Sequence, residues 1–483
     1  MGRFSTSIAA VALVTGAASQ QFDILRHVGG NGQWFPGPEV TGISSETPEG
    51  CTVELAGFFS RHGSRYPDRG AYNGWVDLQT RLQASGNLTT SDPSLAFLST
   101  WSPVLSDPAQ QIAQISPTGY KELHAMGATW RLRYAHLYDY NTPFTMWANW
   151  YASSPRVRDS ARLFAQGFIG PNATTLGTIY ALNASDPASW MNSLGTSDLC
   201  PAYRDSEGAP YTTVWNEKYR PPIRERLNAL VTGFSFTDDD VSSIPYLCGF
   251  ETQIAGRRSP FCDILTEEEV LAYEYAQDLR YWYGAGLGYD IGKSTMLPVL
   301  AGFVQRLVDG PNATYTTSSN TTFVPPKVIA NFANDGQINQ LIAATGIFDN
   351  EPSLSANFSD PDRKFRASRI VTMRGTVAFE RLSCPSAAAT PPQNQTYTAS
   401  NSTSPNTYIR LLLNDVVYPV ANCADGPGSS CSLAKYQSIV QGKMDAVGDF
   451  KKMCNATNPA FETRPVATFF RDDTVEQGIP IKP

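Results

Sequence analysis

The sequence predicts an α/β fold: a mostly parallel sheet covered by helices on both faces, with an inserted, mainly helical cap domain. Three observations lead to this prediction. Three segments repeat one plan, in which an apolar strand is followed by a tight polar turn and then a helix. The middle of the chain is dominated by helical patterns. The composition, 42% hydrophobic and 17% charged, is that of a globular protein.

The first segment opens with the apolar run TVELAGFF at 52–59, which is typical of a strand buried on both faces. A polar turn follows at 60–66. A helical stretch then runs from about 74 to 84. The change from an apolar run to a polar turn places the polar residues just beyond the end of the strand.

The second segment has a strand at 144–152 and a turn at 153–156, and its helix carries apolar residues at helical spacing. Three aromatic residues of this strand are expected in the core: Trp147, Trp150 and Tyr151. The third segment has a strand at 327–332, a polar turn at 334–336 and then an apolar helix. Because the loops after parallel strands share one edge of a sheet, where ligands bind, we expect all three polar turns to meet in one crevice.

The chain is expected to divide into three parts. Residues 1–19 read as a signal peptide, because a positive start precedes a short apolar run and a small-residue cleavage site. Residues 20–156 and 296–483 are assigned to the α/β domain, and 157–295 to the mainly helical cap insertion. The signal peptide predicts a secreted, extracellular or cell-wall protein.

The net charge of −7 argues against nucleic acid or an anionic membrane surface as the partner. No apolar stretch after the signal peptide has the length that spans a bilayer, so membrane anchoring is not expected. An anionic small molecule would have to be attracted by local cations. The sequence leaves the oligomeric state open.

Eight cysteines follow the signal peptide, and an even number in a secreted chain predicts four disulfides. Their spacing alone leaves the pairing open. A metal site is the weaker interpretation, because the chain has no CxxC motif and no histidine near any cysteine.

Nine Asn-X-Ser/Thr sequons predict N-glycosylation of exposed loops. They are Asn87, Asn172, Asn183, Asn312, Asn320, Asn357, Asn394, Asn401 and Asn455.

The densest polar cluster is RHGSRYP at 61–67, directly after the first predicted strand. Its two arginines, Arg61 and Arg65, carry planar forks that match phosphate oxygens. His62 lies between them, and nearby cations favour its neutral, nucleophilic form. Gly63 allows a close backbone approach to a ligand. A surface turn is the alternative for an isolated RxxxR, but the histidine and the preceding strand favour a functional site.

This cluster resembles the RHGxRxP signature of the histidine acid phosphatases. The lead-in WFPGPEVTGISSETPEGC at 34–51 is similar to that of the fungal acid phosphatase and phytase-like branch. The helix start SPTG at 116–119 and the segment from Arg156 to Phe164 also resemble this family, and the cysteines fall in the same order. The resemblance covers nearly all of the chain after residue 19.

The resemblance implies a secreted phosphomonoesterase in which His62 attacks phosphorus and forms a phosphohistidine. Arg61, Arg65 and Arg156 would hold the phosphate, and no metal or cofactor would be needed because the arginines supply the positive charge. The substrate would be a small-molecule phosphomonoester. The same resemblance implies the disulfides Cys51–Cys384, Cys200–Cys454, Cys248–Cys262 and Cys423–Cys431.

One position departs from the family pattern. After the late strand, family members have His-Asp, whereas this chain has Asn334-Asp335. Asp335 is expected to be the general acid. Asn334 takes the place of a phosphate-binding histidine, and no other histidine lies nearby to replace it. An ordinary turn is the alternative for Asn-Asp-Gly, because all three residue types favour turns.

Three functions are therefore open. The first is a histidine acid phosphatase. The second is a phosphatase-like protein with weakened or redirected chemistry, such as anion or metabolite binding or a non-phosphatase reaction, and Asn334 motivates it. The third is a structural cell-wall glycoprotein, which the sequons would allow but which leaves the arginine cluster unexplained.

Overall fold

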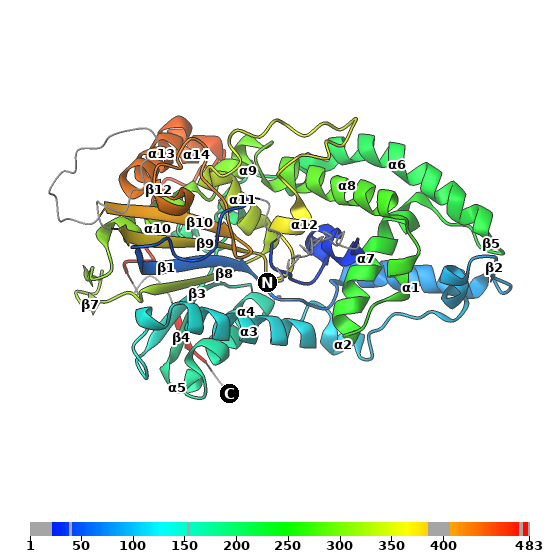
Figure 1. The fold of residues 1–483 in the computed structure, drawn as a ribbon, viewed down its shortest axis with the longest axis horizontal. Helices are drawn as coiled ribbons and strands as arrows, with labels where there is room; N and C mark the ends of the chain where they lie inside the picture. The colour runs from blue at the N-terminus through cyan, green and yellow to red at the C-terminus, as the bar shows by residue number, and fades with distance from the viewer. Residues whose placement is uncertain (1–21, 38–40, 152–154, 385–405, 473–476, 482–483) are drawn as a thin grey trace, which may run out of the picture.

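The computed structural model describes residues 22–37, 41–151, 155–384, 406–472 and 477–481 (Figure 1). The predicted signal peptide and two of the sequons, Asn394 and Asn401, lie outside these residues. The seven other sequon asparagines all have exposed side chains.

The main sheet of the described chain has nine strands in the order β11-β10-β9-β1-β8-β3-β4-β13, with β12 paired to β10. The strands are β1 (Thr52–Arg61), β3 (Phe144–Asn149), β4 (Gly177–Leu182), β8 (Val328–Ala333), β9 (Thr376–Cys384), β10 (Asn406–Leu413), β11 (Val416–Val417), β12 (Cys431–Ser432) and β13 (Gln477–Pro480). The four central strands, β1, β8, β3 and β4, are parallel, and antiparallel strands extend both margins. The predicted α/β class is confirmed.

The helices that form the layers and the cap are α1 (Arg69–Ala84), α3 (Pro117–Arg133), α4 (Arg156–Ile169), α6 (Ala209–Leu230), α7 (Asp238–Ala255), α8 (Glu267–Ala285), α9 (Asp290–Ser294), α10 (Leu297–Asp309), α11 (Asp335–Thr345), α12 (Ala367–Ile370), α13 (Leu433–Val447) and α14 (Phe450–Met453). Helices α3 and α4 cover one face of the sheet, and α10, α11 and α13 cover the other (Figure 1). Successive side chains of a strand point to opposite faces. Phe58 of β1 therefore packs in one core cluster and Phe59 in the other.

A third core belongs to the cap, which lies beside the sheet at the right of Figure 1. It is formed by side chains of α1, α6, α7 and α8, among them Trp75 and Phe250, whose rings meet edge to face at 6.0 Å. The crevice between the sheet and the cap is therefore bordered by two separately packed units.

The structure divides the chain differently from the expected insertion at 157–295. Within that range, β4 pairs in parallel with β3, and α4 packs against α3 and the sheet, so both belong to the α/β layers. Two neighbouring parallel strands need a crossover connection, and α4 is part of it. Helix α1 was expected in the α/β domain, but its buried residues Trp75 and Leu78 pack in the cap core.

The four disulfides implied by the resemblance are all present: Cys51–Cys384, Cys200–Cys454, Cys248–Cys262 and Cys423–Cys431. The first joins the residue before β1 to the end of β9, its antiparallel neighbour. Among the described residues, no helix has the length and hydropathy that crossing a membrane requires.

A buried ion cluster attaches α8 to α12 and to the start of the described chain. Arg363 pairs with Asp278 at 2.6 Å and with Glu274 at 3.4 Å, and both carboxyl groups are fully buried. His27 places Nδ1 3.0 Å from Glu274 Oε1 and stacks on Phe22. Burial and the charge of Glu274 together raise the pKa of Asp278 to about 7, against the opposing effect of Arg363.

This raised pKa predicts that the contribution of Asp278 to stability falls as the pH rises through the acid range. A carboxyl group whose folded pKa exceeds its unfolded value of about 4 stabilises the fold below that value and loses the contribution towards about pH 7. We expect the Tm of the wild type to fall by ~2–5 °C more than that of Asp278→Asn between about pH 4.5 and 7. Calorimetry would measure this. Asp290→Asn, which alters an exposed carboxyl, should keep the wild-type slope, and equal slopes in Asp278→Asn would contradict the prediction.

Candidate active site

The three predicted polar turns meet at one edge of the sheet. β1 and β8 run in parallel register with Arg61 opposite Ala333, and β3 lies on the other side of β8 with Ala148 opposite Phe332. All three strands therefore end side by side. Arg156 is the first residue of α4 and Asp335 is the first residue of α11, so the positive ends of two helix dipoles also face this edge.

His62 is held firmly at the base of the site. Its backbone N–H donates to the Ala333 carbonyl at 3.1 Å, and its own carbonyl accepts from Arg374 N–H at 2.8 Å. Its side-chain Nδ1 lies 2.9 Å from the Gly63 carbonyl oxygen. A carbonyl oxygen only accepts hydrogen bonds, so Nδ1 carries the proton and Nε2 keeps its lone pair. Nε2 is the nitrogen that can act as a nucleophile.

The electrostatic surroundings keep His62 neutral. The side chain is only 1% exposed, and burial together with the charges of Arg156, Arg61 and Arg65 holds its pKa well below the usual range. The neutral imidazole therefore persists in acidic solution, where an exposed histidine would be protonated and unable to attack. This agrees with the sequence-based expectation for a histidine among cations.

Arg61 is fixed by the backbone of two distant segments. Its Nη1 donates to the carbonyl oxygens of Gly30 and Val371 at 2.5 and 2.6 Å. Its Nη2 lies 3.5 Å from Asp335 Oδ2. Its buried Nε–H has no hydrogen-bond partner among the described residues. An anion in the crevice would supply the acceptor that this donor lacks.

Arg65 and Arg156 add two further positive charges. Arg65 Nη1 donates to the Tyr66 carbonyl at 2.9 Å, and its guanidinium carbon lies 5.3 Å from the ring centroid of Phe250 in the cap. Burial and the nearby charge of Arg65 lower the pKa of Arg156 to about 10, so it stays charged below neutral pH. The predicted arginines therefore gather around His62, and together they favour a bound anion.

Asp335 is charged in this structure. Its Oδ2 accepts a 2.6 Å hydrogen bond from the Tyr281 hydroxyl in addition to the contact with Arg61. Burial raises the pKa of this carboxyl, but Arg61, Arg280 and the Tyr281 hydrogen bond outweigh that effect and hold it far below its usual range. Asp335 could release a proton to a substrate only after a bound anion had offset the surrounding positive charge.

Asn334 caps the N-terminus of α11 beside Asp335. Its side chain lines the same cavity as Asp198 and Asp335, and its buried Oδ1 has no hydrogen-bond partner among the described residues. Trp147 is buried in the core as expected, but Tyr151 instead extends to the site and bonds to Asp198 at 2.7 Å. The aromatic character of this strand favoured a packing role for Tyr151. Its partner Asp198 lies 47 positions further along the chain, so the local pattern could not reveal the contact.

A cavity of about 350 Å³ opens beside these groups. Its lining includes Arg156, Asp198, Tyr203, Arg280, Tyr281, Asn334, Asp335 and Gln340. A second cavity of about 300 Å³ shares Arg280 and continues between the cap helices α6, α7 and α8. The space next to the reactive groups is therefore suited to a small molecule.

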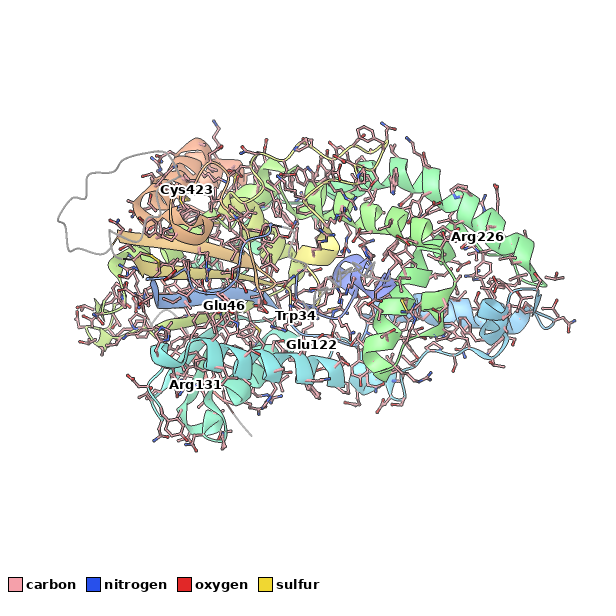
Figure 2. The ribbon with its side chains drawn as sticks, viewed as in Figure 1. Trp34, Glu46, Glu122, Arg131, Arg226 and Cys423 are labelled. Atoms are coloured by element: carbon pink, nitrogen blue, oxygen red, sulfur yellow. A yellow bond between two sulfur atoms is a disulfide. The ribbon has the colours of Figure 1, made fainter. Side chains whose placement is uncertain are left out.

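Three residues that support the site, Arg280, Tyr281 and Glu122, belong to no motif in the sequence. Arg280 and Tyr281 both come from α8 of the cap; the Tyr281 hydroxyl donates to the Asp335 carboxyl, and the positive charge of Arg280 helps to lower the pKa of that carboxyl. Glu122 of α3 lies close to Trp34 (Figure 2) and accepts hydrogen bonds from Ser64 N–H and Oγ at 2.8 and 2.9 Å. The one sequence feature that could have indicated Glu122 is its position in the helix that begins at the SPTG motif. Nothing in the local pattern distinguishes Arg280 from a solvated helix residue.

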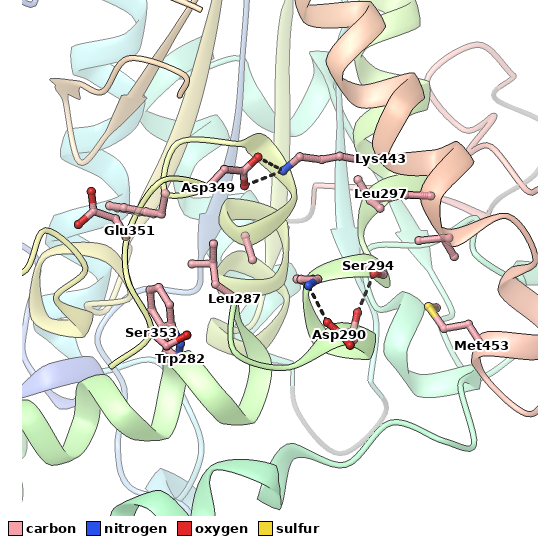
Figure 3. Close-up of a pocket in the computed structure, with 15 residues that line it drawn as sticks. Trp282, Leu287, Asp290, Ser294, Leu297, Asp349, Glu351, Ser353, Lys443 and Met453 are labelled. Atoms are coloured by element: carbon pink, nitrogen blue, oxygen red, sulfur yellow. Dashed lines mark hydrogen bonds and ion pairs between the residues drawn. The ribbon is translucent and has the colours of Figure 1, made fainter. Parts of the chain in front are cut away.

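A larger cavity, of about 700 Å³, lies away from this site among α8, α9, α11 and α13 (Figure 3). Its charged groups all have partners: Lys443 contacts Asp349 at 2.8 Å, Lys293 contacts Asp290 at 2.6 Å, and Glu351 pairs with Lys364 at 2.7 Å. The rest of the lining is largely apolar. These groups offer no nucleophile near an unpaired acid or base, so size alone does not mark this cavity as catalytic.

Comparison with known proteins gives consistent results. Residues 52–414 match the model of the histidine phosphatase superfamily (branch 2). An acid phosphatase of Komagataella pastoris is 30% identical over 94% of this chain and 91% of its own length. A phytase of Candida albicans is 26% identical over 92% of this chain and 90% of its own length.

Among solved structures, the crystal structure of the phytase from D. castellii superposes with a TM-score of 0.79. The match covers 96% of this chain and 94% of that chain at 24% identity, and at this identity it supports the fold alone.

Proposed function

Since the chain belongs to branch 2 of the histidine phosphatase superfamily, we propose that it is a phosphomonoesterase that forms a phosphohistidine on His62. The observation that carries this proposal is the state of His62, which is buried, neutral, protonated on Nδ1 and surrounded by three arginines. Its Nε2 lone pair and the nearby positive charge are what attack on a phosphate ester requires.

In the first step, Nε2 of His62 forms a bond to phosphorus as the bond to the leaving oxygen breaks. The proton of Asp335 moves to that oxygen. In the second step, water attacks phosphorus and gives a proton to the Asp335 carboxylate, while the P–N bond breaks and inorganic phosphate leaves. Arg61, Arg65 and Arg156 hold the phosphoryl oxygens through both steps, and the proposal includes no metal or cofactor.

Protonation links this reaction to acidic solution. The surrounding cations hold the pKa of Asp335 low. A phosphate dianion beside Asp335 cancels part of that positive charge and raises the pKa of the carboxyl. His62 stays neutral at the same pH because burial and arginines depress its pKa. We therefore infer that a neutral nucleophile and a protonated acid coexist only with substrate bound, and best below neutral pH.

The proposed substrate is a small-molecule phosphomonoester, and the proposed location is outside the cell or in the cell wall. Four disulfides, an N-terminal signal-like segment and exposed sequon asparagines support secretion and glycosylation. Acid phosphatases and phytases among the relatives support the substrate class.

Asn334 favours a second candidate function, a phosphatase-like protein whose chemistry is weakened or redirected. An asparagine amide is neutral, whereas a protonated histidine would contact phosphate as a cation. A hydrogen bond to a charged group is worth about 1.5–3 kcal/mol and a typical one about 0.5–1.5 kcal/mol. A protein that still binds phosphate esters but no longer hydrolyses them would be consistent with the loss of this charged hydrogen bond.

We expect the wild type to hydrolyse p-nitrophenyl phosphate between about pH 3 and 6, and Asn334→His to raise kcat/KM by about 10-fold. The reason is the added charge–phosphate hydrogen bond in the transition state. Initial rates from about pH 3 to 8 would measure both proteins, and a rapid-quench experiment would detect labelled phosphohistidine.

Asn350→His, an exposed site, is the matched control. An inactive wild type with an active Asn334→His would replace the first function by the second. Inactivity in every variant would point to binding or to another reaction.

A further inference from the structure

Gly30 lies between Arg61 at the end of β1 and the cap helix α8. It belongs to η2 (Gly29–Asn31), a short 3₁₀ turn whose residues are all buried. Its carbonyl oxygen accepts a hydrogen bond from Arg61 Nη1 at 2.5 Å. Its α-carbon faces Tyr281 of α8 so closely that a methyl group there would overlap the Tyr281 hydroxyl and lie 3.1 Å from Arg61 Nη1. One glycine therefore touches a proposed phosphate ligand and the tyrosine that bonds to Asp335.

Two side-chain contacts hold this turn against α8. His27 places Nδ1 3.0 Å from Glu274 Oε1, and Asn31 Nδ2 donates to the Tyr273 hydroxyl at 3.0 Å. Both partners belong to α8, the helix that also carries Tyr281. The turn and Tyr281 are therefore attached to the same helix, which fixes the distance between them.

The Gly30 carbonyl determines which edge of the Arg61 guanidinium is available to a ligand. Together with the Val371 carbonyl it occupies Nη1. The Nε–H has no hydrogen-bond partner among the described residues, and Nη2 lies 3.5 Å from Asp335 Oδ2. Nε and Nη2 form one edge of the planar guanidinium, and such an edge can bind two phosphate oxygens side by side. A displaced Gly30 would turn this edge away from the site.

The absence of a side chain on Gly30 leaves room for the Tyr281 hydroxyl. That hydroxyl donates to Asp335 Oδ2 at 2.6 Å, the oxygen that Arg61 Nη2 also approaches. Because both contacts use Oδ2, Oδ1 is left to carry a proton to the leaving oxygen. The backbone of Gly30 is not in the left-handed region, so an alanine here adds a methyl group without backbone strain.

We propose that Gly30 is a positioning residue, which orients the Arg61 guanidinium through its carbonyl oxygen and, having no side chain, admits the Tyr281 hydroxyl to Asp335. This inference rests on the proposed function. It assigns a role to a residue outside the RHGSRYP and Asn334-Asp335 motifs, on the segment that begins the described chain.

Gly30→Ala is expected to lower kcat/KM by about 10-fold for p-nitrophenyl phosphate and by about 100-fold for an alkyl phosphate. The methyl group displaces the Tyr281 hydroxyl from Asp335, and this matters most for the substrate whose leaving oxygen needs a proton. The inhibition constant for inorganic phosphate should rise by about 3–10-fold, because Arg61 shifts as well. Gly442→Ala is the matched control, since it lies at an exposed position of α13 where an added methyl group meets no atom within 4 Å.

The double variant with Tyr281→Phe tests the steric part of the inference. Without the hydroxyl, the added methyl group meets the ring at Cζ, 3.2 Å away, a contact that a small shift relieves. In the Tyr281→Phe background, Gly30→Ala should therefore cost less than about 3-fold with either substrate. A loss of folded protein would slow both substrates equally, so the ratio of their rates separates positioning from a defect of the fold.

An equal loss from Gly30→Ala in both backgrounds, an equal loss with both substrates, or no loss would overturn the inference while an active wild type upheld the proposed function. A wild type with no turnover would overturn the proposed function instead. In that case calorimetric titration of the same variants with inorganic phosphate decides the inference. Weaker binding by Gly30→Ala that is restored in the double variant supports it, and unchanged or unrestored affinity overturns it.

Discussion

Replacing His62 with alanine is expected to abolish phosphomonoester hydrolysis, with a loss of about 10⁴–10⁶ in kcat. The imidazole Nε2 is the only group at the base of the described site that is neutral, carries a lone pair and lies among Arg61, Arg65 and Arg156. Alanine removes this nucleophile and keeps the arginines. Phosphate affinity should therefore change little while turnover vanishes.

The measurement is twofold: turnover of p-nitrophenyl phosphate, and covalent labelling after rapid quenching. His124→Ala is the matched control, because His124 has an exposed side chain on α3. A His62→Ala variant that kept more than about 1% of the wild-type rate would contradict the nucleophile assignment. A labelled wild type and an unlabelled His62→Ala with intact phosphate binding would place the intermediate on this residue.

The second large effect is expected for Asp335→Asn. A general acid contributes about 10²–10⁴-fold, and its contribution depends on how poor the leaving group is. We expect a loss in this range with an alkyl phosphate and a much smaller loss with p-nitrophenyl phosphate, whose leaving oxygen needs little protonation. KM should not rise, because the substitution removes a negative charge next to Arg61.

This comparison of leaving groups separates proton transfer from binding. A structural role for Asp335 would slow both substrates equally. Equal losses would therefore contradict the assignment of the acid. Asp290→Asn changes the first residue of another helix, whose exposed carboxyl pairs with Lys293 and does not line the cavity beside Asp335, and it serves as the control. The variant should also lose the fall in rate at higher pH that deprotonation of Asp335 causes, because an amide does not titrate.

Much of the fold followed from local patterns. The apolar runs before Arg61, Arg156 and Asn334 predicted β1, β3 and β8 close to their observed ends. Parallel strands bring the residues that follow them to one sheet edge, so the convergence of the three turns could be expected from the strand–turn–helix repeat alone. The pairing of the cysteines was implied by family resemblance, since spacing had left it open.

The division into domains was harder to foresee. Helical periodicity reports which face of a helix is apolar, but it does not report which core that face joins. Trp75 of α1 and Phe164 of α4 satisfy the same pattern, yet the first packs in the cap and the second under the sheet. Only the crossover between β3 and β4 decided that α4 belongs to the sheet.

The sequence by itself determined which groups could react: a histidine between two arginines, a third arginine at a helix start, and an aspartate after an asparagine. The tertiary structure alone decided how those groups are held. Tyr281 meets Asp335 across 54 positions of sequence, and Tyr151 meets Asp198 across 47. A motif records neighbours along the chain, whereas proton positions and side-chain orientation depend on partners that only folding brings within hydrogen-bond distance.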